Sequence, residues 1–296
     1  MLSRAGTENE HERGETAMST IAEHGATQSQ KLMVFVLSMS LYGLATLISE
    51  LIPSVQIGIV ELSVEFFLFI PLTLAMLFDP LSAALGAATG ELVFSEIMLG
   101  QFGGLGELEK FLTVTIAVYI AGLMVRDPKS TKQVAIAAIS GPAIQLAMSA
   151  VVDIVKVQVA VEDFEAVAGL PESVFATEGF AFANDLLFSG ILFCLLPTMF
   201  LVPRLYGKIE PLLGCKPRSA DTAAPSVSGR VIGWSAAGFI VAIVVACVSK
   251  AGLSIIEWEA DWAESQTALF AGIAVAAVIA VVAAFWAYRT AQLRRA

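Results

Sequence analysis

Carboxylates inside apolar stretches are the side chains of this sequence best suited to bind a ligand. Glu65 lies in the stretch VEFFLFIP, and Glu91 ends the run PLSAALGAATGE. An ionised side chain in hydrocarbon is strongly disfavoured unless it is paired or faces a wet cavity. Two carboxylates at one depth would attract a proton, an inorganic cation or an organic amine. We therefore predict that Glu65 and Glu91 line a binding cavity, with hydrogen bonds to neighbouring helices as the alternative.

A second group of residues could complete this cavity. The stretch FAFANDLLFSG places Asn184 and Asp185 at a depth similar to that of the two glutamates. Phe66 and Phe182 are close to these polar residues in sequence, and an aromatic face attracts a cation by about 0.5 to 2 kcal/mol. Contact with lipid or core is the alternative for both rings. No basic side chain is expected at this depth except Lys156, so the cavity would favour a cationic or amine-bearing solute over an anion.

The remaining acids near the apolar stretches have a simpler interpretation. Glu61 comes four residues before Glu65, which is one turn of the helix predicted over 62–78, so the two would share a face. Glu61, with Glu50 and Glu96, is interpreted as a cap or a solvated helix end at the membrane interface.

These residues require membrane-spanning helices to position them. Hydrophobic residues make up 57% of the 296 positions and charged residues only 15%, which is typical of a membrane protein. The apolar runs have the length of about 17 to 25 residues that a helix needs to cross the bilayer. We predict an all-α polytopic membrane protein with about eight transmembrane helices, at residues 32–49, 62–78, 81–98, 111–125, 133–156, 181–202, 230–250 and 267–288.

The third predicted helix carries a stripe of small residues. The Asp-Pro pair at 79–80 predicts its start, with Asp as N-cap and Pro in the first turn. Ser82, Gly86 and Gly90 then recur every four residues, a spacing that lets a neighbouring helix approach closely. The stripe therefore predicts a helix-packing face, and Glu91 follows it directly.

The basic residues predict the orientation of the chain. If the N-terminus is cytoplasmic, 14 of the 17 Lys and Arg residues fall on the cytoplasmic side, as the positive-inside rule requires. The other three, Lys110, Lys156 and Lys250, lie at helix edges, and the loops on the far side are acidic. We therefore expect a multi-pass protein of the cell membrane with both termini in the cytoplasm. The net charge of −10 argues against nucleic-acid binding.

The order of parts over residues 51–93 is informative. The stretch LIPSVQIGIVELSVEFFLFIPLTLAMLFDPLSAALGAATGELV contains a proline-containing loop, a short helix, a tight turn and a Gly/Ala-rich helix that ends near an acidic residue. This order resembles the substrate-binding S component of energy-coupling-factor (ECF) vitamin transporters. The resemblance implies a six-helix core that binds a vitamin or related micronutrient from outside. It also implies two kinds of partner, a transmembrane coupling subunit and a pair of ABC ATPases.

The resemblance covers about residues 32–203 and leaves the rest of the chain unassigned. Family members dock on the coupling subunit through an Ala-x-x-x-Ala pattern in the first helix, and here only Ala45 and Ser49 have that spacing. We predict four parts: a disordered acidic tail (1–30), a six-helix transmembrane core (31–203), a cytoplasmic linker (204–229) and a two-helix membrane extension (230–296).

Sequence motifs for nucleotide binding, catalysis and metal binding are missing. The Gly-Lys pair at 207–208 lacks the other residues of a phosphate-binding loop, and no Gly-x-Ser-x-Gly is present. His11 and His24 lie in the tail, away from the apolar runs. We expect no enzymatic activity, no cofactor and no metal site. Two alternatives to substrate capture stay open: an ion-coupled secondary transporter that uses Glu65 and Glu91, and a membrane scaffold or assembly protein without transport.

Overall fold

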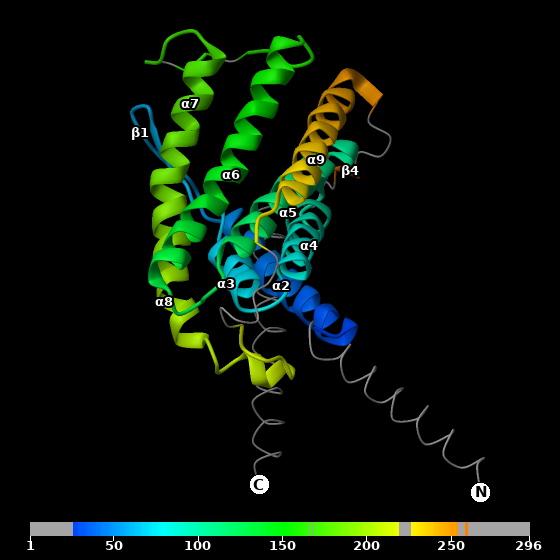
Figure 1. Ribbon diagram of the computed structural model, residues 1–296. Coiled ribbons are helices and arrows are strands. Elements are labelled where there is room, and N and C mark those ends of the chain that lie inside the picture. The colour runs from blue at the N-terminus through cyan, green and yellow to red at the C-terminus, as the bar shows by residue number, and fades with distance from the viewer. Residues whose placement is uncertain (1–25, 165, 168, 219–225, 254–257, 260–296) are drawn as a thin grey trace, which may run out of the picture.

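The computed structural model describes residues 26–164, 166–167, 169–218, 226–253 and 258–259 (Figure 1). It is 72% helical, which is consistent with the predicted all-α class. Nearly all of the predicted tail (1–30) and the whole predicted eighth helix (267–288) lie outside the described residues.

Helices account for most of the described chain. The α-helices are α2 (Gln28–Ser49), α3 (Phe69–Leu77), α4 (Pro80–Glu91), α5 (Glu107–Met124), α6 (Thr131–Gln158), α7 (Val174–Asp185), α8 (Leu196–Leu205) and α9 (Gly229–Val248). Wider π-helical turns form η1 (Leu92–Ile97), η3 (Leu186–Leu195) and η6 (Ser249–Leu253), and tighter 3₁₀ turns form η2 (Gly104–Gly106) and η4 (Glu210–Leu213). Two short antiparallel pairs join β1 (Val55–Ile57) to β2 (Val60–Leu62) and β3 (Gln101–Phe102) to β4 (Trp258–Glu259).

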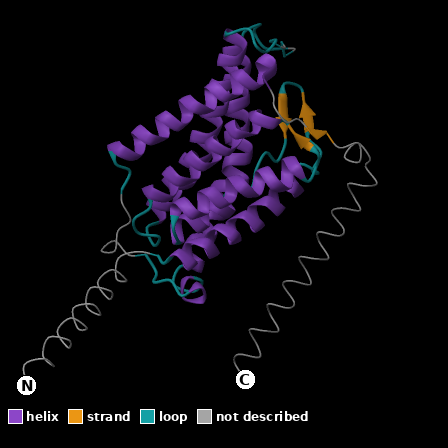
Figure 2. Ribbon diagram, turned by 90° about the vertical axis from the view of Figure 1, so that its right-hand side faces the viewer, coloured by secondary structure: helices purple, strands orange, loops and turns teal. Residues whose placement is uncertain are grey.

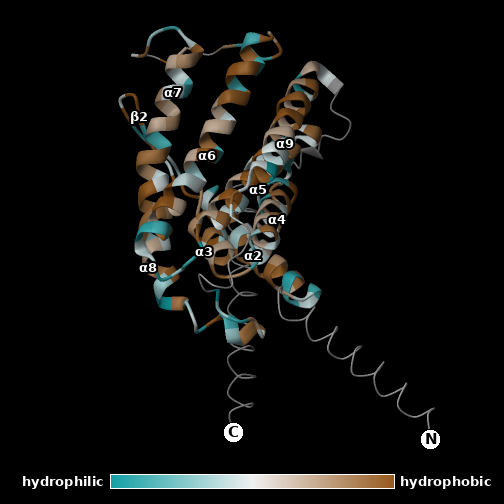
Figure 3. Cartoon of the chain, in the orientation of Figure 1, coloured by the Kyte–Doolittle hydropathy of each residue, from teal (hydrophilic) through white to brown (hydrophobic). Residues whose placement is uncertain are grey.

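Within the described residues, four helical stretches are long and apolar enough to cross a membrane. They are α2, α6, the continuous stretch α7–η3–α8, and α9 with η6. Hydrophobic residues predominate along them, and most of their residues are not buried within the chain, as lipid contact requires (Figure 3). The chain is therefore a membrane protein, and these four stretches coincide with four of the eight predicted spans.

The second predicted helix is much shorter than expected. The prediction covered 62–78, but α3 begins only at Phe69, and its nine residues rise by about 14 Å, less than the thickness of the hydrocarbon core. The preceding residues form the hairpin β1–β2, in which Gly58 has φ 65° at the first position of a two-residue turn. Glu61 therefore lies in β2 and Glu65 in the extended segment after it, so the predicted shared helix face was wrong.

Helix α4 begins as the sequence predicts and packs closely on α2. The Asp79 side chain accepts a hydrogen bond from the Ser82 amide at 2.9 Å, and Pro80 opens the first turn. A Cβ atom on Gly86 would overlap the Phe35 carbonyl oxygen, and one on Gly90 would overlap the Met39 carbonyl oxygen. Two backbones this close exclude side chains between them, so the separation of α2 and α4 is set by the glycines.

The helical bundle has an upper and a lower end in the view of Figure 1. The upper end in Figure 1 comprises residues 98–106, 159–164 and 249–253, and the lower end comprises residues 78–79, 125–130 and 206–218. In Figure 2 the strands gather at one end of the bundle. Helix α9 packs on α5 and α6 near the upper end, so the predicted C-terminal extension begins in direct contact with the predicted core.

One arginine holds the lower end together. Arg218 follows η4, and its Nη1 donates hydrogen bonds to the carbonyl oxygens of Ala75 (2.9 Å) and Met76 (3.0 Å) in the last turn of α3. It also approaches the Gly122 carbonyl of α5 at 3.4 Å. Burial lowers the pKa of Arg218, and the nearby charge of Asp79 partly offsets this effect. The guanidinium therefore satisfies carbonyl groups that the ends of helices leave free.

Candidate functional site

A pocket of about 300 Å³, lined in part by charged residues, opens at the upper end of the bundle, between α5, α6 and α9. We call it the upper pocket. Its lining contains two glutamates and three lysines, together with small residues from η2, α9 and η6. The lining residues are Gly103, Gly106, Glu107, Glu109, Lys110, Lys156, Ala246, Ser249 and Lys250.

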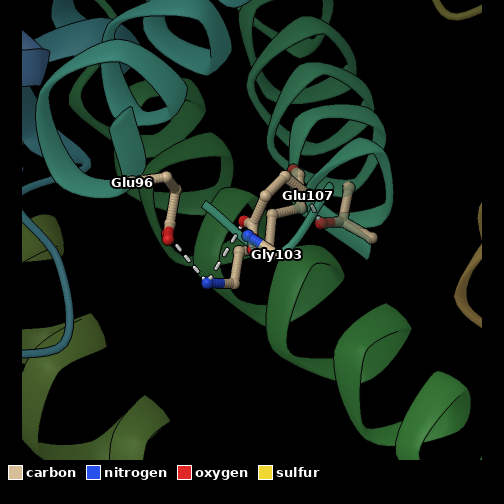
Figure 4. A network of polar contacts seen from close by, with 5 residues as sticks. Glu96, Gly103 and Glu107 are labelled. Carbon is tan, nitrogen blue, oxygen red and sulfur yellow. Dashed lines mark hydrogen bonds and ion pairs between the residues drawn. The ribbon is translucent and has the colours of Figure 1, made fainter. Parts of the chain in front are cut away.

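The first ion-paired group of the upper pocket is centred on Lys110. Its Nζ lies 2.8 Å from Glu96 Oε1 and 3.5 Å from Glu107 Oε2. The Gly103 amide donates to Glu107 Oε1 at 3.3 Å, which fixes the carboxylate toward the loop before α5. Figure 4 shows Glu96 and Glu107 directed toward the same ammonium group from two separate turns of the chain. The lysine thus neutralises part of the negative charge that these two acids bring into the bundle.

The second group joins α6 to η6 across the pocket. Lys156 Nζ lies 2.5 Å from Asp153 Oδ1 and 3.2 Å from Glu162 Oε2, and Lys250 Nζ lies 3.0 Å from Glu162 Oε1. The spacing of three residues between Asp153 and Lys156 predicts their pairing, whereas nothing in the sequence predicts that of Glu162. Burial raises the pKa of the Glu162 carboxyl, but the hydrogen bonds and charges of Lys250 and Lys156 outweigh burial and hold it below its ordinary value.

Glu109 differs from the other acids of the pocket. It comes from the first turn of α5, and within the described part of the chain it forms no ion pair. Burial raises the pKa of the Glu109 carboxyl to about 7, although the charges of Lys156 and Lys110 act in the opposite direction. Neither ammonium group lies within pairing distance of Glu109. Glu109 is therefore a carboxylate that lines the pocket without an ion-pair partner among the described residues.

Glu91 lies in a narrow crevice beside the upper pocket, lined also by Glu96, Glu107 and Lys110. Its Oε2 is buried and has no hydrogen-bond partner among the described residues, and the same is true of the hydroxyl of neighbouring Tyr42. Glu107 and Lys110 line both the crevice and the upper pocket, so the two spaces are neighbours that share part of their walls.

The π-helical turn η1 explains why Glu91 and Glu96 share this crevice. Five residues of α-helix would rotate the second side chain by about 140° from the first. In a π-helix the hydrogen bonds join residues five apart, which brings such residues onto nearly the same face. Glu96 is consequently buried and ion-paired, so its interpretation as a solvated helix end was wrong.

The other predicted site residues lie elsewhere. The Asn184 amide donates to the Glu61 carbonyl oxygen at 2.7 Å, and the Glu65 amide donates to the Ser189 hydroxyl at 3.1 Å. These bonds attach the end of the β1–β2 hairpin to α7 and η3. Neither the upper pocket nor the crevice is lined by the predicted residues Glu65, Asn184, Asp185, Phe66 and Phe182.

The charged neighbours of Glu65 and Glu91 also differ. Glu65 acts on Asp185, whereas the charges that act on Glu91 come from Lys110, Glu96, Glu50 and Glu107. The two glutamates of the predicted cavity therefore have different charged neighbours in the described chain, with Glu50 as a link, because Glu65 acts on Glu50 and Glu50 acts on Glu91. Phe66 is buried in the core rather than exposed to a cavity.

Sequence analysis missed Glu107, Glu109, Lys110 and Lys250 as a group. The predicted fourth helix begins at residue 111, so the charged stretch ELEK lies just outside the prediction, whereas α5 begins at Glu107. The sequence did contain an indication of this pocket. The three lysines that the predicted topology does not place on the cytoplasmic side all line it. Within the described residues, no group of three or more His, Cys, Asp or Glu side chains could hold a metal ion.

Comparison with known proteins identifies a family. No curated protein and no solved structure matches the chain. The model of a family of unknown function, DUF8171, matches residues 33–296, which include every residue of the upper pocket. The chain therefore belongs to the DUF8171 family.

Proposed function

We propose that this chain is a membrane-embedded capture subunit, which binds a small cationic or amine-bearing solute and depends on partner ATPases for its transport. The observation that carries the proposal is the upper pocket, a charged hollow of about 300 Å³ at one end of an otherwise apolar bundle. Such hollows between membrane helices are where solutes bind. The chain has no phosphate-binding loop of its own, so energy for transport would come from a partner, as in the ECF transporters that the sequence resembles.

In this proposal the upper end faces outward. Arg126, Lys129, Arg204 and Lys208 lie at or beside the lower end, which favours the cytoplasmic side. The upper end carries the acidic loop after α6. Capture would then take place from outside the cell, with both termini inside.

Cysteine labelling tests this orientation. In a background with Cys215 and Cys247 replaced by serine, Thr131→Cys should react with an impermeant maleimide only in inside-out vesicles. Ala166→Cys should react only in right-side-out vesicles, because exposed residues on opposite ends cannot face the same compartment. Labelling of position 166 from the inside would reverse the orientation and with it the direction of capture.

Co-purification tests the dependence on partners. The full chain, expressed in its own host and extracted in mild detergent, should bring down a pair of ABC ATPases through a transmembrane coupling subunit. Mass spectrometry of the purified complex reads out both kinds of partner. Full-rate solute transport by the purified chain alone in liposomes would instead favour a secondary transporter. If the experiments detect no transport and no partner ATPase, a scaffold role is favoured.

One observation favours the secondary transporter as the second candidate. The Oε2 atom of Glu91 is buried without a hydrogen-bond partner among the described residues, and the buried Tyr42 hydroxyl lies near it. A buried acid in this setting binds a proton or a small cation readily, which is the coupling step such a carrier requires.

A further inference from the structure

We propose that the upper pocket binds the ammonium group of its ligand at Glu107 and Glu109, and that Lys110 competes with the ligand for Glu107 as a tethered cation. The inference rests on the proposed function, since it assigns the ligand class of the same pocket. It assigns cation binding to Glu107 and Glu109 instead of Glu65, which lies outside the pocket, and it gives Lys110 a role.

The carboxylates of the pocket have binding capacity left. Glu109 lacks an ion pair in the described chain, as shown above. The Glu107 side chain is only 10% exposed, and its Oε2 has no hydrogen-bond partner among the described residues, although Lys110 lies 3.5 Å away. A buried carboxylate oxygen without a hydrogen bond is unfavourable, and a donor from a bound ligand would relieve it.

The lysines, in contrast, are already engaged. Lys110, Lys156 and Lys250 each lie within 4 Å of at least one carboxylate. Among the described residues, five carboxylates lie around these three ammonium groups, so the acids outnumber the lysines by two. An anion could reach the lysines only by separating existing ion pairs. A cation, in contrast, would supply positive charge that the carboxylates lack.

Lys110 is suited to give way to a ligand. Its side chain is 52% exposed, while the acid it contacts most closely, Glu96, is only 9% exposed. The ammonium group can therefore turn toward solvent while the acids stay in place, provided that a ligand cation replaces it beside them. A ligand ammonium can then replace it beside Glu107, within the same pocket.

The size of the pocket limits the ligand. A volume of about 300 Å³ corresponds to about ten water molecules. This accommodates a small amine and excludes a folded peptide. Ser249 and the backbone of Gly106 line the same wall and could contact the uncharged part of such a molecule.

Binding of a matched series of small probes tests the proposal. Butylammonium, γ-aminobutyrate and butyrate are titrated into the full chain in phosphatidylglycerol nanodiscs, with calorimetry or ligand-observed NMR as the readout. Butylammonium should bind saturably and more tightly than butyrate. Tighter binding of butyrate, or no saturable binding of butylammonium, would overturn the ligand class.

Two substitutions should change butylammonium affinity in opposite directions. Glu109→Gln should weaken binding by about tenfold or more, because the unpaired charge is lost. Lys110→Met should tighten it several-fold, because a competing cation is removed. Glu172→Gln and Lys132→Met, which change exposed residues without ion pairs in the described chain, serve as matched controls and should leave affinity unchanged.

The design separates this proposal from the proposed function. Weaker butylammonium binding in Lys110→Met would contradict the competition, and unchanged binding in Glu109→Gln would contradict the site. If Lys110→Met does not fold, Glu109→Gln still decides the site, since Glu109 supports no ion pair in the described residues. Loss of butylammonium binding when the nanodiscs contain phosphatidylethanolamine would assign the pocket to a lipid headgroup instead of a solute. If ATPases co-purify with the chain but the chain binds butyrate, the capture function would stand and the cationic ligand class would be rejected.

Discussion

Replacing Gly90 by alanine is expected to destabilise the protein strongly, while the same change at Gly233 leaves stability unchanged or slightly higher. A Cβ atom on Gly90 would overlap the Met39 carbonyl oxygen and lie 3.0 Å from the Gly43 nitrogen, and backbone atoms cannot turn aside as a side chain can. The helices α2 and α4 would have to separate, at a cost of about 1–3 kcal/mol or more. At Gly233 no atom lies within 4 Å of the new Cβ, and alanine favours a helix by about 1 kcal/mol.

Thermal unfolding in detergent, followed by intrinsic fluorescence, gives the measurement. Because both variants gain one methyl group in a helix, any difference between them reports the α2–α4 contact. The variant Gly86→Ala should behave like Gly90→Ala, since its Cβ would overlap the Phe35 carbonyl oxygen. An unfolding temperature of Gly90→Ala equal to that of Gly233→Ala would show that the two helices are not in close contact.

Replacing Arg218 by methionine is expected to release the lower end of the bundle. The change keeps the apolar stem but removes the donors to the Ala75 and Met76 carbonyl oxygens. Hydrogen bonds from a charged group contribute about 1.5–3 kcal/mol each, so the segment that carries Arg218 should detach from α3 and α5. The Tyr206 hydroxyl, which donates to the Arg218 carbonyl oxygen, would lose its fixed partner as well.

Limited trypsin digestion detects this release. Cleavage after Lys208, which precedes η4 and is followed by Ile209, should become several-fold faster in Arg218→Met. Arg230→Met is the matched control, because Arg230 is exposed at the start of α9 and makes no ion pair in the described chain. Cleavage of Arg218→Met at the wild-type rate would show that the segment is held by its apolar contacts instead.

The elements predicted best are those with a local physical cause. The start of α4 follows from an Asp side chain that caps free amides and a Pro that needs no amide hydrogen, and both effects are complete within four residues. The long apolar spans follow equally directly from the need to cover a bilayer with hydrophobic side chains. By contrast, the hairpin β1–β2 lies in an apolar run, where composition alone cannot distinguish strand from helix.

The candidate site could be predicted only in part, because its pairs are not local. Glu96 and Lys110 are fourteen residues apart, and Glu162 pairs with Lys250 across most of the second half of the chain. No periodicity relates such residues. A prediction that assumes 3.6 residues per turn also misses the π-helical turn η1. It places Glu91 and Glu96 on different faces of the helix. The residues of the pocket therefore emerge only from the packing of α5, α6 and α9.

The close contact of α2 with α4 also has a consequence for the order of events on the ribosome. Phe35 and Gly86, whose backbones meet, are separated by about fifty residues of chain. At a synthesis rate of roughly 5–20 residues per second, α2 leaves the ribosome about 3 to 10 s before its partner is complete. During that interval the insertion machinery or lipid must cover the face that α4 later occupies. The first stable intermediate in biogenesis is therefore expected to be a hairpin of α2 and α4, with the short helix α3 held between them.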